Sequence, residues 1–418
     1  MLLKNRLNLL FVNPPIYDFT AYDFWLKPYG LLKIAGALSN HNIFYFNFLS
    51  ENFKKSIKDD GRGKFVKQKV VKPKIFSDIP KPYFRYGAPK ENFESFLMEI
   101  KTIDAVFITS SMTYWYLGVK EVIESIKKFH KNAKIILGGI YPTLIPHHAQ
   151  KLYVDLVIKG SDLSPVEDFL EVKMKTFIPE WSFEKGSRFG ILTISKGCPF
   201  NCSYCAIKTI EKNFRFKERE IIEKEFSSLK QMKIKNVAFY DDSLLFKFDE
   251  GLNNFLNNIN ISDFIFHTPN GLNVKFLTKR VALRLKETNF KNLFLSLENI
   301  DEDFLKRSGN KLQKEDFLNG LDNLLSAGFK KENITTYLLF GHPEIDDEAT
   351  KDSIVFLKKL GLKPHLSEFS PVPKSVDSEK CAKFTDLDEP LNHNKVAFSI
   401  RVLGLDNYQK LKSFAKGG

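Results

Sequence analysis

The sequence is poor in cysteine and lacks any long apolar run. Four cysteines among 418 residues are too few for a disulfide scaffold, and three of them fall within residues 198–205, a grouping typical of metal ligands in a reducing compartment. The mostly apolar run 7–12 is too short for a signal-peptide core or a membrane span, and Asn13-Pro14-Pro15 ends it at once. We therefore expect a cytoplasmic protein that does not cross a membrane.

No single motif accounts for the positive charge. The formal net charge of +13 is spread through a lysine-rich composition, so charge alone does not indicate a nucleic-acid partner. Its densest part is 54–90, which also contains four prolines. Because solvated charge is the ordinary use of lysine, we expect the basic insertion 51–92 to be solvated and without regular elements, and not to bind nucleic acid.

Length and composition predict two domains, since 418 residues with 43% hydrophobic content exceed the usual size of one core. In the first part, short apolar runs alternate with helical patterns, and residues 119–129 carry an apolar stripe at helical spacing. Such runs predict a parallel sheet covered on both faces, that is, a doubly wound, Rossmann-like α/β domain. The expected strands are Leu7–Phe11, Ile43–Phe48, Ala105–Ser110, Ile135–Leu137 and Leu156–Ile158.

The second part repeats the strand–helix alternation six times, which predicts a partial (β/α)6 barrel of the TIM type with its chemistry at the C-terminal ends of the strands. The expected strands are Ile191–Ile194, Val237–Tyr240, Phe264–Phe266, Leu293–Leu297, Thr335–Phe340 and Leu366–Ser370. We accordingly divide the chain into a first domain 1–165, a linker 166–187, a barrel 188–375 and a tail 376–418 that is helical in part, over 396–411.

Three cysteines stand on one short loop after the first barrel strand. Residues 196–205 read KGCPFNCSYC, so that Cys198, Cys202 and Cys205 have the spacing C-x3-C-x2-C. Thiolates are preferred ligands of iron–sulfur clusters, and three of them leave one iron of a four-iron cluster open to a further ligand. The alternatives are a structural zinc site without an obvious fourth ligand nearby and plain burial of the thiols.

This segment resembles the signature of the radical S-adenosylmethionine (SAM) superfamily, which has an aromatic residue before the last cysteine, here Tyr204. The resemblance extends from about residue 188 to 375. It implies a [4Fe-4S] cluster on the three cysteines, whose open iron binds the amino and carboxylate groups of SAM. One electron from the cluster, supplied by a donor such as flavodoxin or ferredoxin, would then split SAM into methionine and a 5′-deoxyadenosyl radical.

The resemblance also implies SAM contacts after the later strands. Asp241 and Asp242 would lie near the SAM ammonium, although either also suits a helix cap. Ser296 and Glu298 point to one face if the strand alternates regularly, and Glu298 would bind hydroxyl groups. Gly341 belongs to a fifth-strand motif in which we interpret His342 as structural. The SAM-binding candidates are thus Tyr204, Asp241, Asp242, Ser296, Glu298, Gly341 and Val372, and no catalytic side chain is assigned.

A doubly wound domain before such a barrel resembles the radical SAM enzymes that have an N-terminal cobalamin-binding domain. The likeness lies in Pro28, Gly30, Gly138 and Gly139, where small residues after strands leave room for a planar ligand at the sheet edge. No Asp-x-His-x-x-Gly motif is present, so cobalamin would bind without a histidine on cobalt. The bulky run 114–116 departs from the pattern.

The function that this resemblance favours is a cobalamin-dependent methyltransferase that acts at an unactivated carbon of a small molecule or peptide. One alternative is a radical rearrangement or redox enzyme whose first domain is only a scaffold. Another, from a different class, is a noncatalytic iron–sulfur protein that binds RNA. Methylthiolation of transfer RNA is disfavoured, because the enzymes that perform it carry additional N-terminal cysteines.

Overall fold

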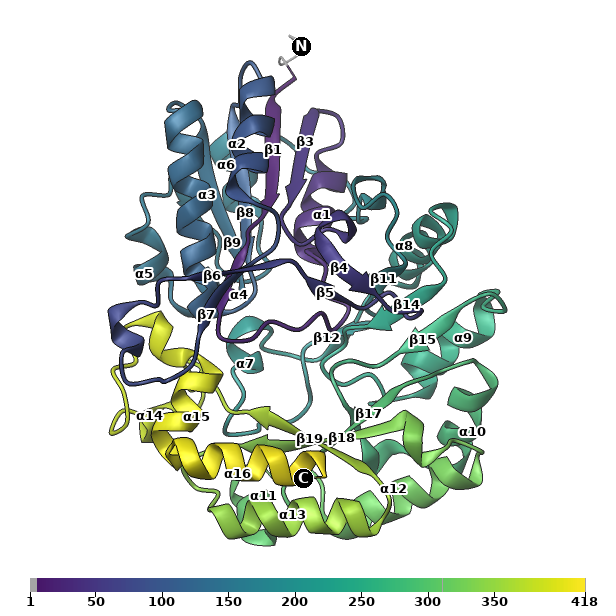
Figure 1. Cartoon of the computed structure of the whole chain (residues 1–418). Coiled ribbons are helices and arrows are strands. Elements are labelled where there is room, and N and C mark those ends of the chain that lie inside the picture. The colour runs from purple at the N-terminus through teal and green to yellow at the C-terminus, as the bar shows by residue number, and fades with distance from the viewer. Residues whose placement is uncertain (1–5, 310, 418) are drawn as a thin grey trace. The chain divides into compact units, whose positions relative to one another are not determined.

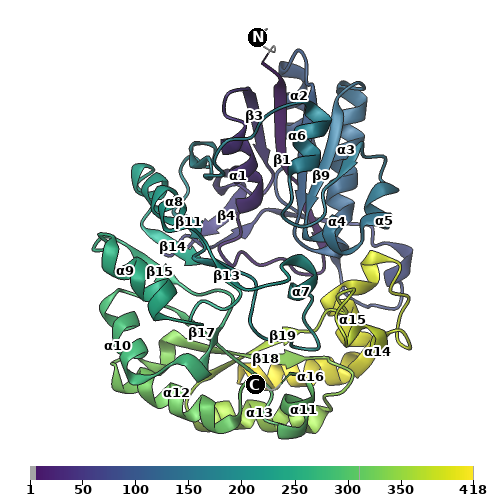
Figure 2. The same ribbon diagram turned by 180° about the vertical axis from the view of Figure 1, so that it is seen from behind.

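The structure, a computed structural model, describes residues 6–309 and 311–417 and divides into two compact units. Unit 1 comprises Met1–Arg188 and Lys224–Ile234, and unit 2 comprises Phe189–Glu223 and Lys235–Gly418. The chain therefore passes between the units three times, and the later part of α8 (Arg219–Gln231) belongs to unit 1 (Figures 1 and 2).

Unit 1 is built on a five-stranded parallel sheet in the order β10-β9-β8-β1-β3, as expected for a doubly wound fold. All five predicted strands are present, with ends that differ from the prediction by one or two residues. Their bounds are β1 (Asn8–Asn13), β3 (Asn42–Asn47), β8 (Ala105–Ser110), β9 (Lys134–Gly139) and β10 (Leu156–Val157).

Alternation along the central strands gives unit 1 a core on each face of the sheet. Leu10 and Val12 face a core shared with α2 (Lys90–Glu99) and α3 (Tyr116–Phe129). Leu9 and Phe11 face the opposite core, shared with α1 (Tyr29–Ala37) and α6 (Ser164–Leu170). Two short helices, α4 (Ile140–Leu144) and α5 (Pro146–Gln150), follow β9.

The prediction that the basic insertion lacks regular elements is wrong. It forms an antiparallel hairpin, β4 (Lys54–Ile57) with β5 (Gly63–Phe65), and two strands, β6 (Lys67–Val70) and β7 (Tyr83–Tyr86), which make an antiparallel sheet with β2 (Ile16–Asp18). The four prolines all lie outside these strands. The lysines are accommodated because their stems cover apolar rings, as where the Lys67 ammonium lies 3.9 Å from the centre of the Phe84 ring.

Unit 2 contains the six predicted barrel strands, all parallel, together with a short additional strand (Figure 1). They form two sheets, β11-β14-β15 and β16-β17-β18-β19, and a single bridge between Phe266 and Phe290 continues the first sheet past β15. The bounds are β11 (Phe189–Leu192), β14 (Asn236–Phe239), β15 (Ile265–His267), β16 (Leu272–Asn273), β17 (Leu293–Glu298), β18 (Ile334–Phe340) and β19 (Lys363–Glu368).

Helices follow the strands of unit 2 and cover the outside of the curved sheet (Figure 1). They are α9 (Asn254–Asn258), α10 (Lys279–Glu287), α11 (Glu302–Arg307), α12 (Lys314–Ser326) and α13 (Asp347–Lys359). The end of the chain adds α14 (Ser378–Cys381), α15 (Lys395–Leu403) and α16 (Leu405–Lys416). The predicted helix over 396–411 is therefore two helices, which meet at Gly404 with φ 75°.

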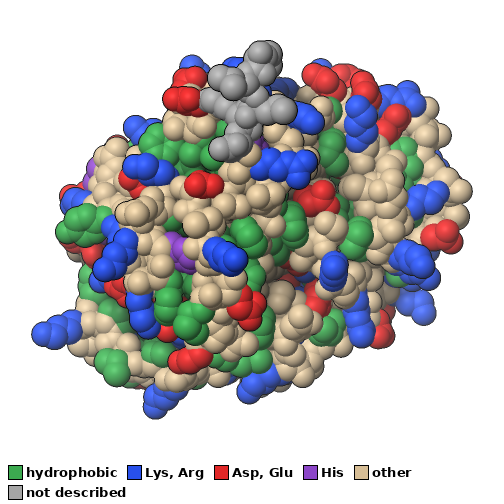
Figure 3. Space-filling model, turned by 90° about the horizontal axis from the view of Figure 1, so that it is seen from above, with side chains coloured by type: hydrophobic (Ala, Val, Ile, Leu, Met, Phe, Trp, Pro, Cys, Tyr) green, Lys and Arg blue, Asp and Glu red, His purple; other side chains and the backbone are tan. Residues whose placement is uncertain are grey.

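The face in Figure 3 carries lysine and arginine side chains interspersed with aspartate and glutamate. Within the described residues, no helix combines the length and the hydropathy that crossing a membrane requires.

Replacing Gly118 tests how closely α3 packs against the chain at Pro15. A Cβ at this position of α3 would lie 1.9 Å from the carbonyl oxygen of Pro15, so we expect Gly118→Ala to destabilise the unit by about 1–3 kcal/mol. Gly30→Ala is the matched control, because Gly30 also lies in a helix but a Cβ there meets no atom within 4 Å. Thermal unfolding of both variants checks this; equal unfolding temperatures would contradict the packing.

Candidate functional site

The three cysteines lie on the loop between β12 (Ser195–Lys196) and α7 (Ile207–Ile210) of unit 2. β12 pairs with β13 (Arg215–Phe216), so the loop returns on itself. Cys198 and Cys202 are partly buried and Cys205 is exposed, and the charges of the three thiols influence one another. The loop thus presents all three predicted ligands in one place.

The surroundings and the spacing of the three thiols bear on which metal group they can hold. Burial raises the pKa of all three, that of Cys205 to about 11, so they need nearby positive charge to ionise. One zinc ion with Zn–S bonds of about 2.3 Å would bring its thiolates within about 4 Å of one another. Among the described residues, the group of potential ligand atoms that lie mutually within 4.8 Å does not include the cysteines. Their wider spacing fits a multi-iron cluster better than a single ion.

Two aspartates after β14 hold the start of the cysteine loop. Asp241 accepts hydrogen bonds from the backbone amides of Ile194 and Ser195 and from the Ser195 hydroxyl, at 2.6–3.0 Å through Oδ1. Asp242 accepts one from the Gly197 amide at 3.2 Å. Burial raises the pKa of both carboxyl groups to about 6, against the hydrogen bonds that lower it. Asp241 therefore holds the residues that lead into the cysteine loop, and Asp242 holds Gly197, the residue just before Cys198.

Ser308, Gly309 and Lys311 also lie near the cysteine loop. The Ser203 amide donates to the Ser308 carbonyl at 3.1 Å. Gly309, at φ +115°, lies so close that a Cβ there would be 2.9 Å from the Asn201 carbonyl oxygen. Lys311 follows, and its ammonium lowers the pKa of Cys198 and Cys202 against the dominant effect of burial. Lys208, whose ammonium donates to the Cys198 carbonyl oxygen, also brings positive charge to the cysteine site.

Glu298 pairs with this lysine, with 3.5 Å between Oε1 and Nζ. Burial alone would lower the pKa of Lys311, but Glu298 and the neighbouring thiols outweigh burial and raise it. Glu298 has φ 67°, a conformation that costs free energy in a residue other than glycine and is often found at functional sites. The structure thus brings Glu298 to the cysteine loop.

The expectation of a shared face for Ser296 and Glu298 is wrong in its geometry. Ser296 is paired with Tyr337 and Glu298 with the next residue, Leu338, so β17 is irregular between them and the alternation rule does not apply. Ser296 instead lies under the turn after β15, where a Cβ on Gly271 would be 2.7 Å from its Oγ.

The remaining SAM candidates of unit 2 have mostly packing contacts. Tyr204 packs against an apolar cluster that includes Phe369 and Phe398, and its hydroxyl interacts with Cys202. Gly341, at φ 75°, lets α15 approach, because a Cβ there would be 2.3 Å from Ser399 Oγ. Val372 is partly buried in the loop after β19.

In unit 1, a small pocket with about 20 Å³ of enclosed space opens at the carboxyl ends of β1 and β8. Pro28 lines it, together with polar residues such as Asn13, Thr109 and Ser111. The other three cobalamin candidates do not line it. Gly139 packs against β8, where a Cβ would lie 2.5 Å from the Ser110 carbonyl oxygen. A Cβ on Gly138 would lie 3.7 Å from Ile158 Cβ, an ordinary contact distance, whereas Gly30 has open space beside it.

Sequence reasoning missed two residues at the cysteine loop, Lys311 and Asp377. Asp377 accepts a 2.6 Å hydrogen bond from the Ser203 hydroxyl. Neither stands in a recognisable motif, and Asp377 is 174 residues away from its partner. The one available signal for Lys311 was its place shortly after the fourth barrel strand.

Comparison with known proteins gives the class. Residues 192–357 match the family model of the radical SAM superfamily. The chain is 25% identical over 319 residues to the threonylcarbamoyladenosine tRNA methylthiotransferase MtaB of Thermotoga maritima, covering 68% of this chain and 72% of that protein. It is 26% identical over 312 residues to the bacteriochlorophyllide d C-12(1)-methyltransferase of Chlorobaculum tepidum, covering 65% and 64% of the two chains.

Solved structures share the architecture. The radical SAM methyltransferase TsrM from Kitasatospora setae, solved with cobalamin and a [4Fe-4S] cluster, matches 90% of this chain and 79% of its own with a TM-score of 0.65 at 12% identity. The cobalamin-dependent SAM radical enzyme OxsB matches 97% of this chain but only 56% of its own, with a TM-score of 0.54 at 12% identity.

The chain therefore contains a radical SAM domain over residues 192–357 and is an enzyme. Its cofactors include a [4Fe-4S] cluster and SAM, and Cys198, Cys202 and Cys205, with their spacing and buried surroundings, fit the cluster. When bound, the cluster supplies the electron that cleaves SAM. The protein's own part is to hold three thiolates while leaving one iron open.

We expect Cys→Ala variants at positions 198, 202 and 205 each to lose the cluster absorbance and the production of 5′-deoxyadenosine after anaerobic reconstitution. Cys381→Ala is the control, because Cys381 is fully buried in an apolar cluster and donates its thiol to the Asp377 carbonyl. A variant at any of the three loop positions that retained 5′-deoxyadenosine production would contradict the assignment.

Glu298→Ala should weaken SAM binding roughly ten- to a hundredfold and leave the cluster in place, because it removes a partly buried charged acceptor beside the cysteine loop. Glu302→Ala, in the next helix and exposed, is the matched control. Calorimetric titration of the reconstituted variants with SAM measures the difference, and equal affinities would make Glu298 a structural residue.

Proposed function

We propose that this chain is a cobalamin-dependent radical SAM methyltransferase. The observation that carries the proposal is the architecture, a doubly wound unit and a partial-barrel unit with a three-cysteine loop, which matches TsrM over 90% of the chain. The relative from Chlorobaculum tepidum, a methyltransferase by name, supports the same reaction class.

The polar pocket at the carboxyl edge of the unit 1 sheet is the place that we propose for part of the cobalamin. Ligands of open α/β sheets bind outside the carboxyl ends of the strands. The amide of Asn13 and the hydroxyls of Thr109 and Ser111 suit amide groups of such a ligand. The pocket's enclosed space of about 20 Å³ is far below the size of sites for drug-sized ligands, so the pocket as it stands would receive at most one side group of a corrin and not the ring.

We propose that cobalamin binds at this pocket without a histidine on cobalt. None of its twelve lining residues is histidine. Lys27 lines it as well, but Glu184 at 2.6 Å and Glu51 at 3.3 Å already pair with its ammonium. Bound cobalamin would supply a carrier for the methyl group. The chain's contribution would be to bind it without competing for cobalt.

Methylthiolation is the second candidate, because MtaB and other methylthiotransferases are relatives. Against it stands the number of cysteines. Apart from the loop, the chain has only Cys381, which lies in an apolar cluster near the end of the chain. A second cluster would therefore lack protein thiolates, and methyl transfer is the better supported reaction. As partners we propose a small-molecule or peptide substrate and an electron donor of the flavodoxin or ferredoxin kind.

Anaerobic titration of the reconstituted protein with hydroxocobalamin tests the proposal. We expect one equivalent to remain bound after gel filtration, and Ser111→Phe, which fills the pocket, to weaken binding at least tenfold. Ser77→Phe, the same change at an exposed position of unit 1, should have no effect. The Co(II) resonance spectrum should be identical for protein labelled with ¹⁴N- or ¹⁵N-histidine.

Failure to retain the corrin would remove the methyltransferase proposal and favour the radical rearrangement alternative. A spectrum that changes with the histidine label would overturn the open lower face. RNA affinity that falls steeply with salt, combined with no SAM cleavage, would favour the noncatalytic alternative.

A further inference from the structure

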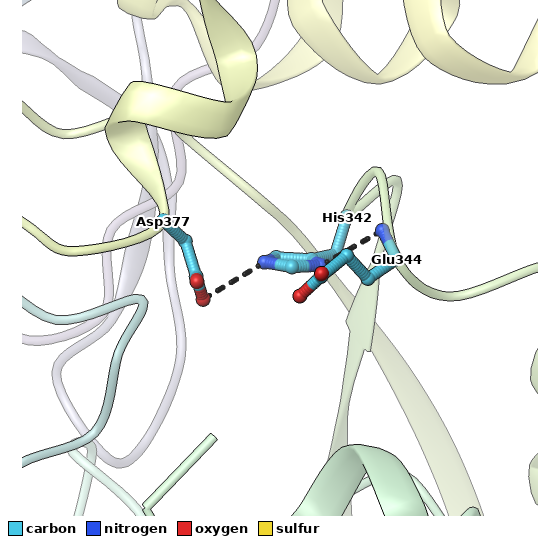
Figure 4. A group of neighbouring side chains, drawn as sticks. All are labelled: His342, Glu344 and Asp377. Carbon is cyan, nitrogen blue, oxygen red and sulfur yellow. Dashed lines mark hydrogen bonds and ion pairs between the residues drawn. The ribbon is translucent and has the colours of Figure 1, made fainter. Parts of the chain in front are cut away.

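A group of charged side chains lies behind the cysteine loop, at the junction of β18 and α14 (Figure 4). It consists of His342, Glu344 and Asp377, whose potential ligand atoms are all within 4.8 Å of one another, together with Lys380. His342 is fully buried and the Asp377 side chain is 1% exposed. A buried ionised group must be matched by partners, so each contact of Asp377 bears on its role.

Asp377 holds Ser203 at two points. Its Oδ2 accepts the Ser203 hydroxyl at 2.6 Å, and its backbone amide donates to the Ser203 carbonyl oxygen at 2.9 Å. The Ser203 amide is bound as well, by Ser308. Every hydrogen-bonding group of Ser203 therefore has a partner outside the loop. Ser203 lies directly after Cys202 and two residues before Cys205, so these contacts fix the segment that carries two of the three ligands.

His342 orients the Asp377 carboxylate. Its Nδ1 accepts the Glu344 amide at 3.2 Å, which leaves the proton on Nε2, and Nε2 lies 3.1 Å from Asp377 Oδ2. The rings of Phe304 and Phe369 pack against the imidazole, with centroids 5.3 and 4.6 Å away, so it has one position. The expectation that His342 is a structural residue agrees with these contacts.

A metal ion is not needed to explain this group. Lys380 pairs with Glu344 at 2.8 Å and with Asp377 Oδ1 at 3.0 Å, so an ammonium already bridges the two carboxylates. Both imidazole nitrogens are also engaged. Burial would raise the pKa of Asp377, but the hydrogen bonds from His342, Ser203 and Lys380 outweigh it and hold the pKa well below its usual range. Asp377 is therefore an ionised acceptor at neutral pH.

We propose that Asp377 is a positioning residue of the iron–sulfur site: through Ser203 it fixes the distance between Cys202 and Cys205, and His342 and Lys380 hold it in place. Outer contacts of this kind orient metal ligands and commonly change metal affinity ten- to a hundredfold when removed. The inference concerns the cluster and SAM cleavage, and it does not depend on cobalamin or methyl transfer.

The test compares Asp377→Asn, Ser203→Ala and Glu344→Gln in the reconstituted full chain. Glu344→Gln removes one negative charge from the same group, but the Glu344 side chain makes no contact with Ser203. This variant therefore tests the effect of charge separately from the effect of positioning. We expect Asp377→Asn to release iron to a chelator roughly tenfold faster than the parent protein and to shift the cluster midpoint potential. Ser203→Ala should act in the same direction without any change of charge, and Glu344→Gln should match the parent.

The double variant, Asp377→Asn with Ser203→Ala, gives a further test. It should release iron no faster than Asp377→Asn alone, because both substitutions remove one contact. Parent-like release from both single variants would overturn the proposal, as would equal effects of Glu344→Gln and Asp377→Asn. If Asp377→Asn does not fold, Ser203→Ala decides by itself: parent-like iron release and midpoint potential would overturn the proposal, and faster release with a shifted potential would support it.

Discussion

Hydrogen bonds to carboxylates, of which Asp241 and Asp377 are buried, are the constraint on which the shape of the cysteine loop depends. The loop has almost no regular structure, so its shape must come from side chains elsewhere. Asp241 and Asp242 bind its start, and Asp377 binds its middle. Such groups are costly to bury, and the pKa of about 6 for Asp241 means that its hydrogen bonds do not offset the full cost. These carboxylates therefore serve to position the cysteine loop more than to stabilise unit 2.

Unit 1 meets a different requirement, since its parallel sheet must be covered on both faces and yet open at one edge. The two cores supply the cover. The antiparallel insertion contributes to the edge, because Phe65 and Tyr86 pack with Ile16, Leu49 and Trp115, and the last three of these also line the pocket. The size of that pocket is thus set in part by a segment that is not part of the doubly wound fold.

The sequence was sufficient for the parallel strands and the cysteine loop, because both depend on local patterns. Buried parallel strands are apolar along their whole length, and the ligands of the loop lie within eight residues. The antiparallel insertion was missed because its lysine-rich strands have little of the apolar content expected of strands. The irregularity at Glu298 was missed because nothing in the residues LFLSLE reveals a break of alternation. Asp377 was missed because its role exists only through a partner far away in the chain.

Charges of both signs lie around the cysteine loop, and only some of them are paired with each other. Lys311 faces Glu298, and Lys380 faces Glu344 and Asp377. Lys208 instead donates to the carbonyl oxygen of Cys198, and its charge lowers the pKa of that thiol, whereas the charge of Asp242 raises it. A cation beside thiolates makes an iron–sulfur cluster easier to reduce, and an anion makes it harder. The chain thus places at one loop side chains that would shift the cluster potential in opposite directions.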